Sequence, residues 1–330
     1  MNNTMKTRDY FFDNLKVLLI FLVVFCHGLE RVTDSSDFNL TLHKLILCFV
    51  MPAFVFVTGY FSKNMAIENC PKRIRILNFI LLYIIVQAVK MYIWDSTSFL
   101  KPTYANWYIW ACIVWYTVLP TVAKLKPVYG IGLSLLVGIF CGTDSSVSAT
   151  LQISRVLCFF PYFLFGYYLS AKSFEWLEDL KARKYEFLLL IFSIFLCLNW
   201  TDGLPYGILH ANKSFKQMDL SVLEGGINRC IWYLLTSLCF IGMASIIPRK
   251  KNGLSFIGER TLAIYVFHTL AYSIVLQTDF FAIIESKYGT LCYIGILSVV
   301  ATLIFGNKLF TELLNKLMKY DFHHFISPPI

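Results

Sequence analysis

A histidine near the end of a long apolar run is the feature of this sequence that points most clearly to chemistry. The run covers residues 15–29, LKVLLIFLVVFCHGL, with Lys16 near its start and His27 near its end. If the run is a helix, the eleven-residue spacing separates the two side chains by about 16 Å along the axis. Ionisable groups are costly inside apolar helices and usually serve a reaction or a transport pathway. His27 is therefore a candidate catalytic residue, the alternative being a histidine that only reaches towards an interface.

The residues around His27 suit a proton-transfer role. An imidazole changes its protonation state near neutral pH, so it can take the proton of a hydroxyl group that attacks an acyl donor. Glu30 follows three residues later on the same helix face, where its carboxylate could orient the ring. The alternative for Glu30 is a solvated carboxylate at the end of the helix. Cys26 points about 100° away from His27, which argues against a cysteine–histidine dyad.

The composition places these residues in a membrane protein. Of the 330 residues, 57% are hydrophobic and 15% are charged, and the mean hydropathy is +0.63. A soluble domain of ordinary composition is excluded by these values. The net charge of +9 comes from short Lys and Arg clusters between apolar runs, without the basic and aromatic tract typical of nucleic-acid binding. We therefore expect a polytopic membrane protein that does not bind nucleic acid.

The apolar runs predict an all-α fold of about ten transmembrane helices in a single membrane domain, residues 1–330. The predicted spans are 15–30, 41–62, 76–94, 107–122, 128–142, 152–171, 185–200, 227–247, 256–278 and 288–306. Lys and Arg cluster on alternate sides of these spans, and the positive-inside rule makes the richer side cytoplasmic. Both termini are then predicted to be cytoplasmic. The longest outer loop, 201–226, is predicted to be a lid on the acceptor side.

The cysteines and histidines give no sign of a metal site. Most of the ten cysteines lie inside apolar runs, among them Cys26, Cys48, Cys112, Cys158, Cys197, Cys239 and Cys292, and there cysteine behaves as a small hydrophobic residue. They therefore give no signal for a redox compartment. No His, Cys or carboxylate residues occur at the spacing of metal ligands, so we expect no metal cofactor.

Six blocks of sequence occur in an order typical of one enzyme family. They are DNLKVLLIFLVVFCH (13–27), MPAFVFVTGYFSK (51–63), KRIRILNFILLYII (72–85), NWYIWACIVWY (106–116), SRVLCFFPYFLFGYYL (154–169) and IGERTLAIYVFH (257–268). Together they resemble acyltransferase family 3 and, within it, the fucose 4-O-acetylase-like proteins. The blocks are spread over residues 13–268, which is most of the chain, and six ordered matches are more specific than any one of them.

The resemblance implies an integral membrane enzyme that takes an acyl group, usually acetyl, from cytoplasmic acyl-CoA. The implied acceptor is a sugar hydroxyl of an envelope glycan or its lipid-linked precursor, at a bacterial plasma membrane. Lys16 stands where the family has an arginine, with ten residues between it and the histidine taken to be essential. Lysine keeps the positive charge but lacks the bidentate fork of arginine. Val50 stands where the family often has a further histidine.

The resemblance also assigns roles to other residues. It supports Arg155 as the cation that stabilises an oxyanion, the alternative being an interfacial arginine. The phosphates of acetyl-CoA need cations on the cytoplasmic side, and the candidates are Lys16, Lys72, Arg73 and Arg75. For these cations the alternative is a purely topological role. Trp107 is predicted to line the acyl path or to anchor the interface, and His268 to pack without acting in catalysis.

A secondary transporter or flippase for a small polar or glycan solute is the second function that the sequence allows. Intramembrane His, Lys and Arg residues also mark solute pathways, but the sequence has no inverted repeat to support this function. A sensory or scaffold protein would leave His27 and Lys16 without a role. The predicted partners are membrane lipids and a glycan or lipid-linked sugar, and the sequence leaves the oligomeric state open, a homodimer included.

Overall fold

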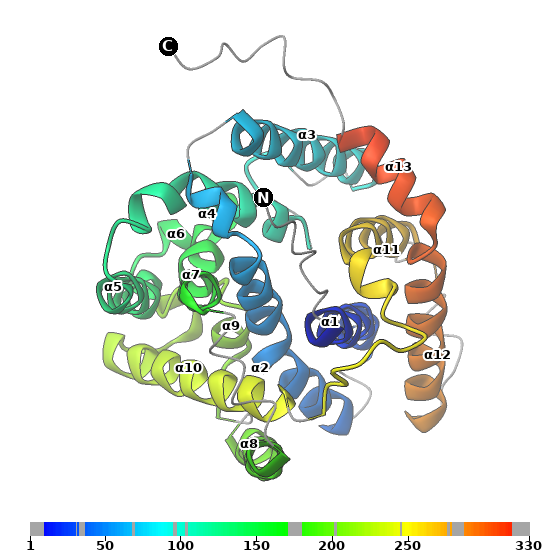
Figure 1. Ribbon diagram of the computed structural model, residues 1–330. Coiled ribbons are helices and arrows are strands. Elements are labelled where there is room, and N and C mark those ends of the chain that lie inside the picture. Colours follow the sequence, from blue (N-terminus) through cyan, green and yellow to red (C-terminus); the bar gives the residue numbers. More distant parts are fainter. Residues whose placement is uncertain are drawn as a thin grey trace.

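The helices predicted from the apolar runs form a bundle in the computed structural model of the protein (Figure 1). The structure describes residues 10–30, 32, 37–67, 70–94, 98–102, 105–170, 180–200, 203–244, 246–275, 278 and 287–318. The longer helices in these ranges are α1 (Tyr10–Leu29), α2 (Asp37–Tyr60), α3 (Cys70–Ile93), α4 (Asn106–Val122), α5 (Pro127–Phe140), α7 (Ile153–Tyr168), α8 (Leu180–Trp200), α10 (Val222–Ala244), α11 (Thr261–Val275), α12 (Lys287–Phe305) and α13 (Lys308–Met318). Short helical turns are η2 (Lys63–Ala66), η3 (Cys141–Thr143), α6 (Ser146–Ala149), η4 (Thr150–Gln152), α9 (Tyr206–Leu209), η6 (Lys216–Met218) and η7 (Ile257–Glu259).

The all-α prediction is confirmed for the described ranges, which contain no strand. Each apolar run predicted from the sequence overlaps one of the long helices. Within the described ranges, five helices are both long and apolar enough to cross a membrane: α1, α2, α3, α10 and α12. Others, such as the 14-residue α5 and the 15-residue α11, are shorter than the roughly 20 residues that a straight span needs.

Helix α1 starts earlier than the apolar run suggests. It begins at Tyr10 and so also includes Asp13, whose side chain forms an ion pair of 3.0 Å with Lys16, one turn later. The two opposite charges compensate each other, which lets the helix extend past them. The sequence prediction missed this pair because it counted only apolar residues.

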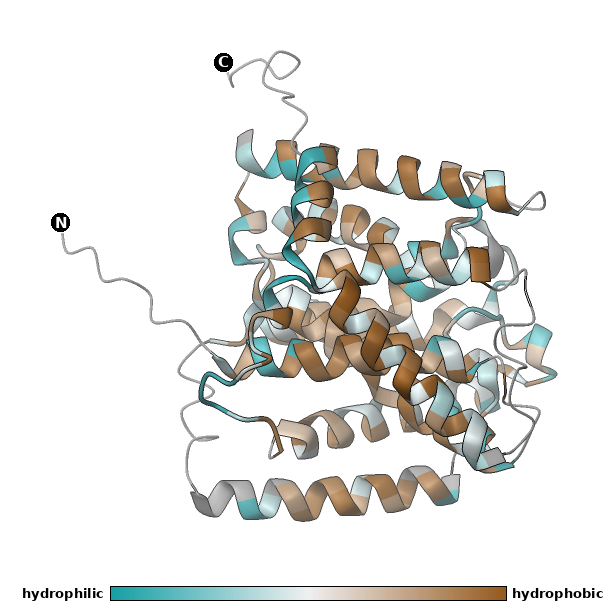
Figure 2. Ribbon diagram, turned by 90° about the vertical axis from the view of Figure 1, so that its right-hand side faces the viewer, coloured by the Kyte–Doolittle hydropathy of each residue, from teal (hydrophilic) through white to brown (hydrophobic). Residues whose placement is uncertain are grey.

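The outer surface of the bundle is apolar along the helices. Figure 2 shows hydrophobic residues along most of the helix lengths, with hydrophilic residues concentrated in loops and at helix ends. Large exposed hydrophobic side chains are frequent on α5, α8 and α12; examples are Leu133, Phe192 and Val300. Such extensive exposed apolar surface is stable against lipid tails but not against water.

Helix α1 lies in the middle of the bundle, enclosed by α2, α11 and α12 (Figure 1). Polar contacts hold its first half in place. The side-chain amide of Asn14 donates to the backbone oxygens of Pro248 at 2.7 Å and Lys250 at 3.0 Å, and Ser255 Oγ donates to Asn14 Oδ1 at 2.7 Å. These bonds hold α1 against the connection between α10 and α11 and thereby fix the position of Lys16 along the axis of the bundle.

Two helices cross at very close range through glycines. A Cβ atom on Gly59 of α2 would lie 1.9 Å from the backbone oxygen of Phe163, and one on Gly166 of α7 would lie 2.0 Å from that of Phe56. Contacts this short with backbone atoms leave no room for any side chain. Small residues at such crossings are a usual device of membrane helices, because close backbones gain dispersion contacts. The crossing fixes α7 against α2.

We predict that Gly166→Ala destabilises the protein by about 1–3 kcal/mol, because the added methyl group forces α2 and α7 apart. Gly132→Ala is the matched control, since no atom lies within 4 Å of a Cβ at that helical position. Alanine is the better helix former, so the control should be neutral or stabilising. Thermal unfolding of the two variants in detergent tests the difference. Equal midpoints for both variants would contradict the close crossing.

Candidate active site

The histidine and glutamate of the first helix lie together, as their spacing predicts. His27 is in the last turn of α1 and Glu30 follows the helix directly. The distance from His27 Nδ1 to Glu30 Oε2 is 3.6 Å, and both side chains are partly exposed, by 24% and 39%. The exposure arises because both side chains line a cavity of about 100 Å³. The carboxylate is therefore placed to orient the ring and to stabilise its protonated form.

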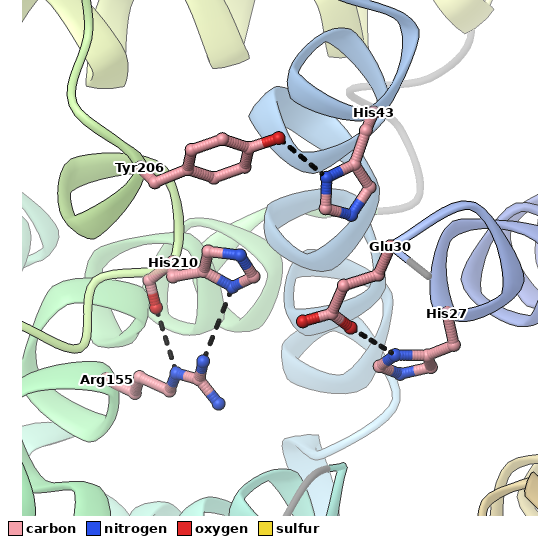
Figure 3. Close-up of polar contacts among 6 residues, drawn as sticks. All are labelled: His27, Glu30, His43, Arg155, Tyr206 and His210. Carbon is pink, nitrogen blue, oxygen red and sulfur yellow. Dashed lines mark hydrogen bonds and ion pairs between the residues drawn. The ribbon is translucent and has the colours of Figure 1, made fainter. Parts of the chain in front are cut away.

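Five helices and one loop build this cavity, which we call the His27 cavity. Its walls are formed by Cys26, His27, Glu30, His43, Leu47, Met51, Trp107, Arg155, Phe159, His210 and Tyr265. They come from α1, α2, α4, α7 and α11, with Glu30 just after α1 and His210 from the loop after α9. Figure 3 shows the His27–Glu30 pair and the Arg155–His210 pair on opposite sides of the same space. Of the predicted site residues, the structure thus brings His27, Glu30, Arg155 and Trp107 together.

Arg155 is held rigidly at the wall of the His27 cavity. Its Nε–H donates to the backbone oxygen of His210 at 2.9 Å, and its Nη2 lies 3.4 Å from His210 Nδ1. The guanidinium also lies over the ring of Trp107, 5.1 Å from the centroid. A planar cation fixed by a carbonyl and an aromatic ring keeps its direction, which is what stabilisation of a developing negative charge requires.

Two further imidazole groups face this cavity, and the sequence prediction missed both. His43 is on α2, and its Nδ1 lies 3.0 Å from the hydroxyl of Tyr206 on α9. Since the hydroxyl can donate to Nδ1 and the guanidinium of Arg155 can donate to the Nδ1 of His210, both rings are then neutral with a proton on Nε2. No sequence signal marked His43, Tyr206 and His210 as neighbours, because they lie far apart along the chain.

The charges in the His27 cavity have a clear distribution at neutral pH. Burial tends to raise the pKa of Glu30, but the interactions with His27 and with the other imidazole groups outweigh it and lower the pKa to about 2. Burial and the positive charge of Arg155 lower the pKa of His210 to about 3. Glu30 is therefore an anion opposite the Arg155 cation, and His210 is a neutral hydrogen-bonding group.

His268 packs against the ring of His27. The two rings stack with centroids 5.6 Å apart. The Nδ1–H of His268 donates to the backbone oxygen of Ile264, one turn earlier in α11, at 2.7 Å. His268 is fully buried and is not part of the cavity wall. Its position fits the packing role expected from the sequence.

A second cavity, of about 240 Å³, lies at the other end of α1 and is called the Lys16 cavity here. Lys16 and Arg75 line it together with Tyr108, Tyr116 and other residues of α2, α3, α4 and α11. Tyr265 forms part of the wall of both cavities. The two cavities therefore approach each other at one aromatic ring.

The predicted phosphate-binding cations differ in their positions. Arg75 lies over the ring of Tyr116, 5.4 Å from its centroid, and faces the Lys16 cavity. Lys72 is buried and Arg73 is exposed, and neither is part of the wall of that cavity. The structure thus joins Lys16 with Arg75 and leaves Lys72 and Arg73 at the start of α3.

The loop 201–226, which the sequence analysis expected to be an outer lid, is packed against the helices in its described part, from residue 203 onwards. Leu204, Ile208 and Phe215 are almost completely buried. The backbone N–H of Phe215 donates to the oxygen of Gly142 at 2.7 Å. Through Tyr206 and His210, the loop contributes directly to the site.

In the described part of the chain, no group of three or more His, Cys, Asp or Glu residues could hold a metal ion. The polar side chains that line the His27 cavity are imidazole, carboxylate, guanidinium, thiol and phenol groups.

Comparison with known proteins supports one enzyme family. A family model described as an acyltransferase domain, acyltransferase family 3, matches residues 9–306. No curated protein and no solved structure gives a significant match to the chain.

The low pKa of Glu30 predicts how stability depends on pH. Because the pKa is about 2 in the folded state and about 4.3 in an unfolded chain, the carboxylate stabilises the fold above about pH 4. This contribution is lost as the pH falls from about 4 to about 2, and solvent screening limits it to about 1 kcal/mol. Glu30→Gln should therefore lower thermal stability at pH 7 but hardly at pH 3.

Glu312→Gln is the control for this measurement, since Glu312 pairs only with Lys308 on the exposed surface of α13. It should leave the unfolding midpoint unchanged at either pH. A loss of stability in Glu30→Gln that is as large at pH 3 as at pH 7 would be inconsistent with an ionised Glu30.

Proposed function

Because the chain belongs to acyltransferase family 3, we propose that it is a membrane O-acyltransferase that moves an acetyl group from acetyl-CoA to a sugar hydroxyl of a cell-envelope glycan. One observation carries this proposal. The Lys16 cavity offers cations for a phosphorylated donor, the His27 cavity offers a base and an oxyanion-stabilising cation, and both share Tyr265. A donor bound in one cavity can therefore present its reactive end in the other.

The proposed topology has ten spans with both termini in the cytoplasm, in one membrane domain. The supporting observation is the clustering of Lys and Arg on alternate sides of the long helices. In this orientation the Lys16 cavity opens towards the cytoplasm, where acetyl-CoA is available, and His27 lies towards the outer face. We propose the bacterial plasma membrane as the location of the enzyme, as the family resemblance implies.

The donor would bind through its phosphates. Lys16 and Arg75 can neutralise them in the Lys16 cavity, and Lys72 and Arg73 add positive charge where α3 begins. The ion pair with Asp13 holds the Lys16 side chain in place but also reduces its net charge. The long pantetheine arm of coenzyme A then passes Tyr265 and brings the thioester to His27.

The size of the His27 cavity favours a short acyl group. About 100 Å³ accommodates only a handful of water-sized groups, since one such group needs roughly 10–15 Å³. An acetyl group and one hydroxyl-bearing carbon fit this space, whereas a long acyl chain does not. Trp107 and Phe159 supply the apolar part of the wall beside the acetyl methyl group.

The proposed reaction is a direct transfer. His27 takes the proton of the acceptor hydroxyl while its oxygen attacks the thioester carbon, and Glu30 stabilises the imidazolium that forms. Arg155 stabilises the negative charge that develops on the carbonyl oxygen. As the new C–O bond forms, the C–S bond breaks, and His27 returns the proton to the leaving thiolate. The step consumes no other reactant.

The acceptor side of the cavity suits a molecule rich in hydroxyl groups. His43 and His210 are neutral donors through Nε2, and the Glu30 carboxylate is an acceptor nearby. Such an arrangement matches a sugar, either in an envelope glycan or in its lipid-linked precursor. The resemblance to fucose 4-O-acetylase-like proteins agrees with a sugar hydroxyl.

A transporter remains the second candidate, because two polar cavities at opposite ends of one helix also fit a solute pathway. A transporter neither cleaves acetyl-CoA nor alters the acetyl content of glycans. Incubation of the purified protein with acetyl-CoA and an envelope glycan extract distinguishes the two functions.

We predict that His27→Ala lowers acetyl transfer at least about 100-fold, because the Nδ1 atoms of His43 and His210 already accept hydrogen bonds and the Glu30 carboxylate is a much weaker base than an imidazole. The measurement is the O-acetyl content of envelope glycans, by mass spectrometry, in cells that lack the gene and carry each variant. Cys26→Ala is the matched variant, since Cys26 is the neighbouring residue on the same cavity wall. Direct transfer predicts that it stays active, whereas an acyl-cysteine intermediate predicts that it is inactive.

For Lys16→Ala we predict a KM for acetyl-CoA that is about tenfold higher, with little change in kcat, because one phosphate contact is lost. Lys16→Arg should restore the wild-type KM, since arginine also binds phosphate. Lys251→Ala removes an exposed lysine from the connection between α10 and α11 and controls for general charge. An unchanged KM in Lys16→Ala would remove Lys16 from the donor site.

A further inference from the structure

Two cysteines outside the proposed reaction lie in direct contact. Cys141 is in η3, at the end of α5, and Cys158 is in α7. Their sulfur atoms are 3.3 Å apart, and both thiols donate to the backbone oxygen of Gly138, at 3.3 Å and 3.4 Å. Both are free thiols; Cys158 is completely buried, whereas Cys141 is partly exposed. A small rotation would therefore bring the two sulfur atoms to the distance of a covalent bond, about 2.05 Å.

The close approach of the two thiols is built into the packing of three helices. A Cβ atom on Gly138 would lie only 2.1 Å from the hydroxyl oxygen of Tyr233 and 3.4 Å from Cys158 Cα. The Tyr233 hydroxyl donates to the backbone oxygen of Cys158 at 2.8 Å. Glycine at position 138 thus lets α5, α7 and α10 meet at the level of the thiols and keeps the sulfur atoms together.

A buried arginine completes the cluster. Arg229 on α10 has no exposed surface, and its charge acts on both thiols. Its Nη1 donates to the backbone oxygen of Ile208 at 3.2 Å, but Nε and Nη2 have no hydrogen-bond partner among the residues that the structure describes. The guanidinium also lies over the ring of Trp232, 5.7 Å from its centroid, so one cation is buried at the level of the two thiols. Thiolates near arginine are the reactive form of cysteine.

We propose that Cys141 and Cys158 form a reversible disulfide when the outer face of the protein meets an oxidising environment. The partly exposed Cys141 first attacks the disulfide of an oxidant, either a small disulfide or a disulfide-carrying protein, and releases one thiol. Cys158 then attacks the sulfur of Cys141 in this mixed disulfide and releases the second thiol. The two cysteine protons end on the two released thiols, and the oxidant takes up the two electrons.

The location of the pair connects it with the active site. Cys158 follows Arg155 by one turn of α7, and Arg229 holds the backbone of α9, which carries Tyr206. The disulfide would therefore fix the end of α5 to the helix that carries Arg155. We expect the oxidised protein to have a higher unfolding midpoint than the reduced protein, since the cross-link restricts the unfolded chain.

The test uses the full-length protein in detergent, with oxidised glutathione as the oxidant. After oxidation, the remaining thiols are alkylated and the peptides are analysed by mass spectrometry. We expect a peptide that links Cys141 with Cys158, its loss on reduction, and its absence in Cys141→Ser. Cys292→Ser removes an exposed cysteine of α12 and should leave the link intact.

Arg229→Met tests the part played by the charge. It keeps a long side chain without the positive charge and should slow formation of the link about tenfold. Independent alkylation of Cys141 and Cys158 in wild-type protein after oxidation would overturn the proposed disulfide. Equally fast linking in Arg229→Met would overturn the role of Arg229.

Discussion

Ionisable side chains are stable inside an apolar helix bundle only where other polar groups compensate them, and this constraint shapes the site. Glu30 lies beside His27, and Arg155 is held by the backbone and ring of His210. The carboxylate and the guanidinium face the same small cavity, so each reduces the cost of burying the other. The polar groups that compensate one another's burial are also the groups that carry out the proposed reaction. Removal of one of them changes the charge state of the others.

The central position of α1 lets this one helix contribute side chains to both cavities. One helix carries Lys16 in one cavity and His27 in the other, and Asn14 fixes its height through bonds to the connection between α10 and α11. Because a helix is a stiff spacer of about 1.5 Å per residue, the distance between the donor cations and the base is set by the sequence itself. Binding at one end can therefore present the thioester at the other without a change of fold.

Contacts that depend on local spacing were predictable from the sequence, and contacts between distant segments were not. The helical character of the apolar runs and the proximity of His27 and Glu30 follow from the periodicity of one helix. His43 and His210 reach the same cavity only because α2 and the loop after α9 meet there, which no local pattern reveals. For the same reason, the sequence could not show which of the predicted phosphate-binding cations lie together in one cavity. Arg75 faces Lys16, while Lys72 and Arg73, close to it in sequence, do not line that cavity.

The most direct test of this account is an experimental structure of the protein with coenzyme A bound. The account predicts that the phosphates lie beside Lys16 and Arg75, that the arm passes Tyr265, and that the sulfur atom faces His27 in the cavity it shares with Arg155. Such a complex would join the two cavities through a single ligand. A complex in which the sulfur atom lies outside the cavity lined by His27, with the phosphates bound away from Lys16, would contradict the account.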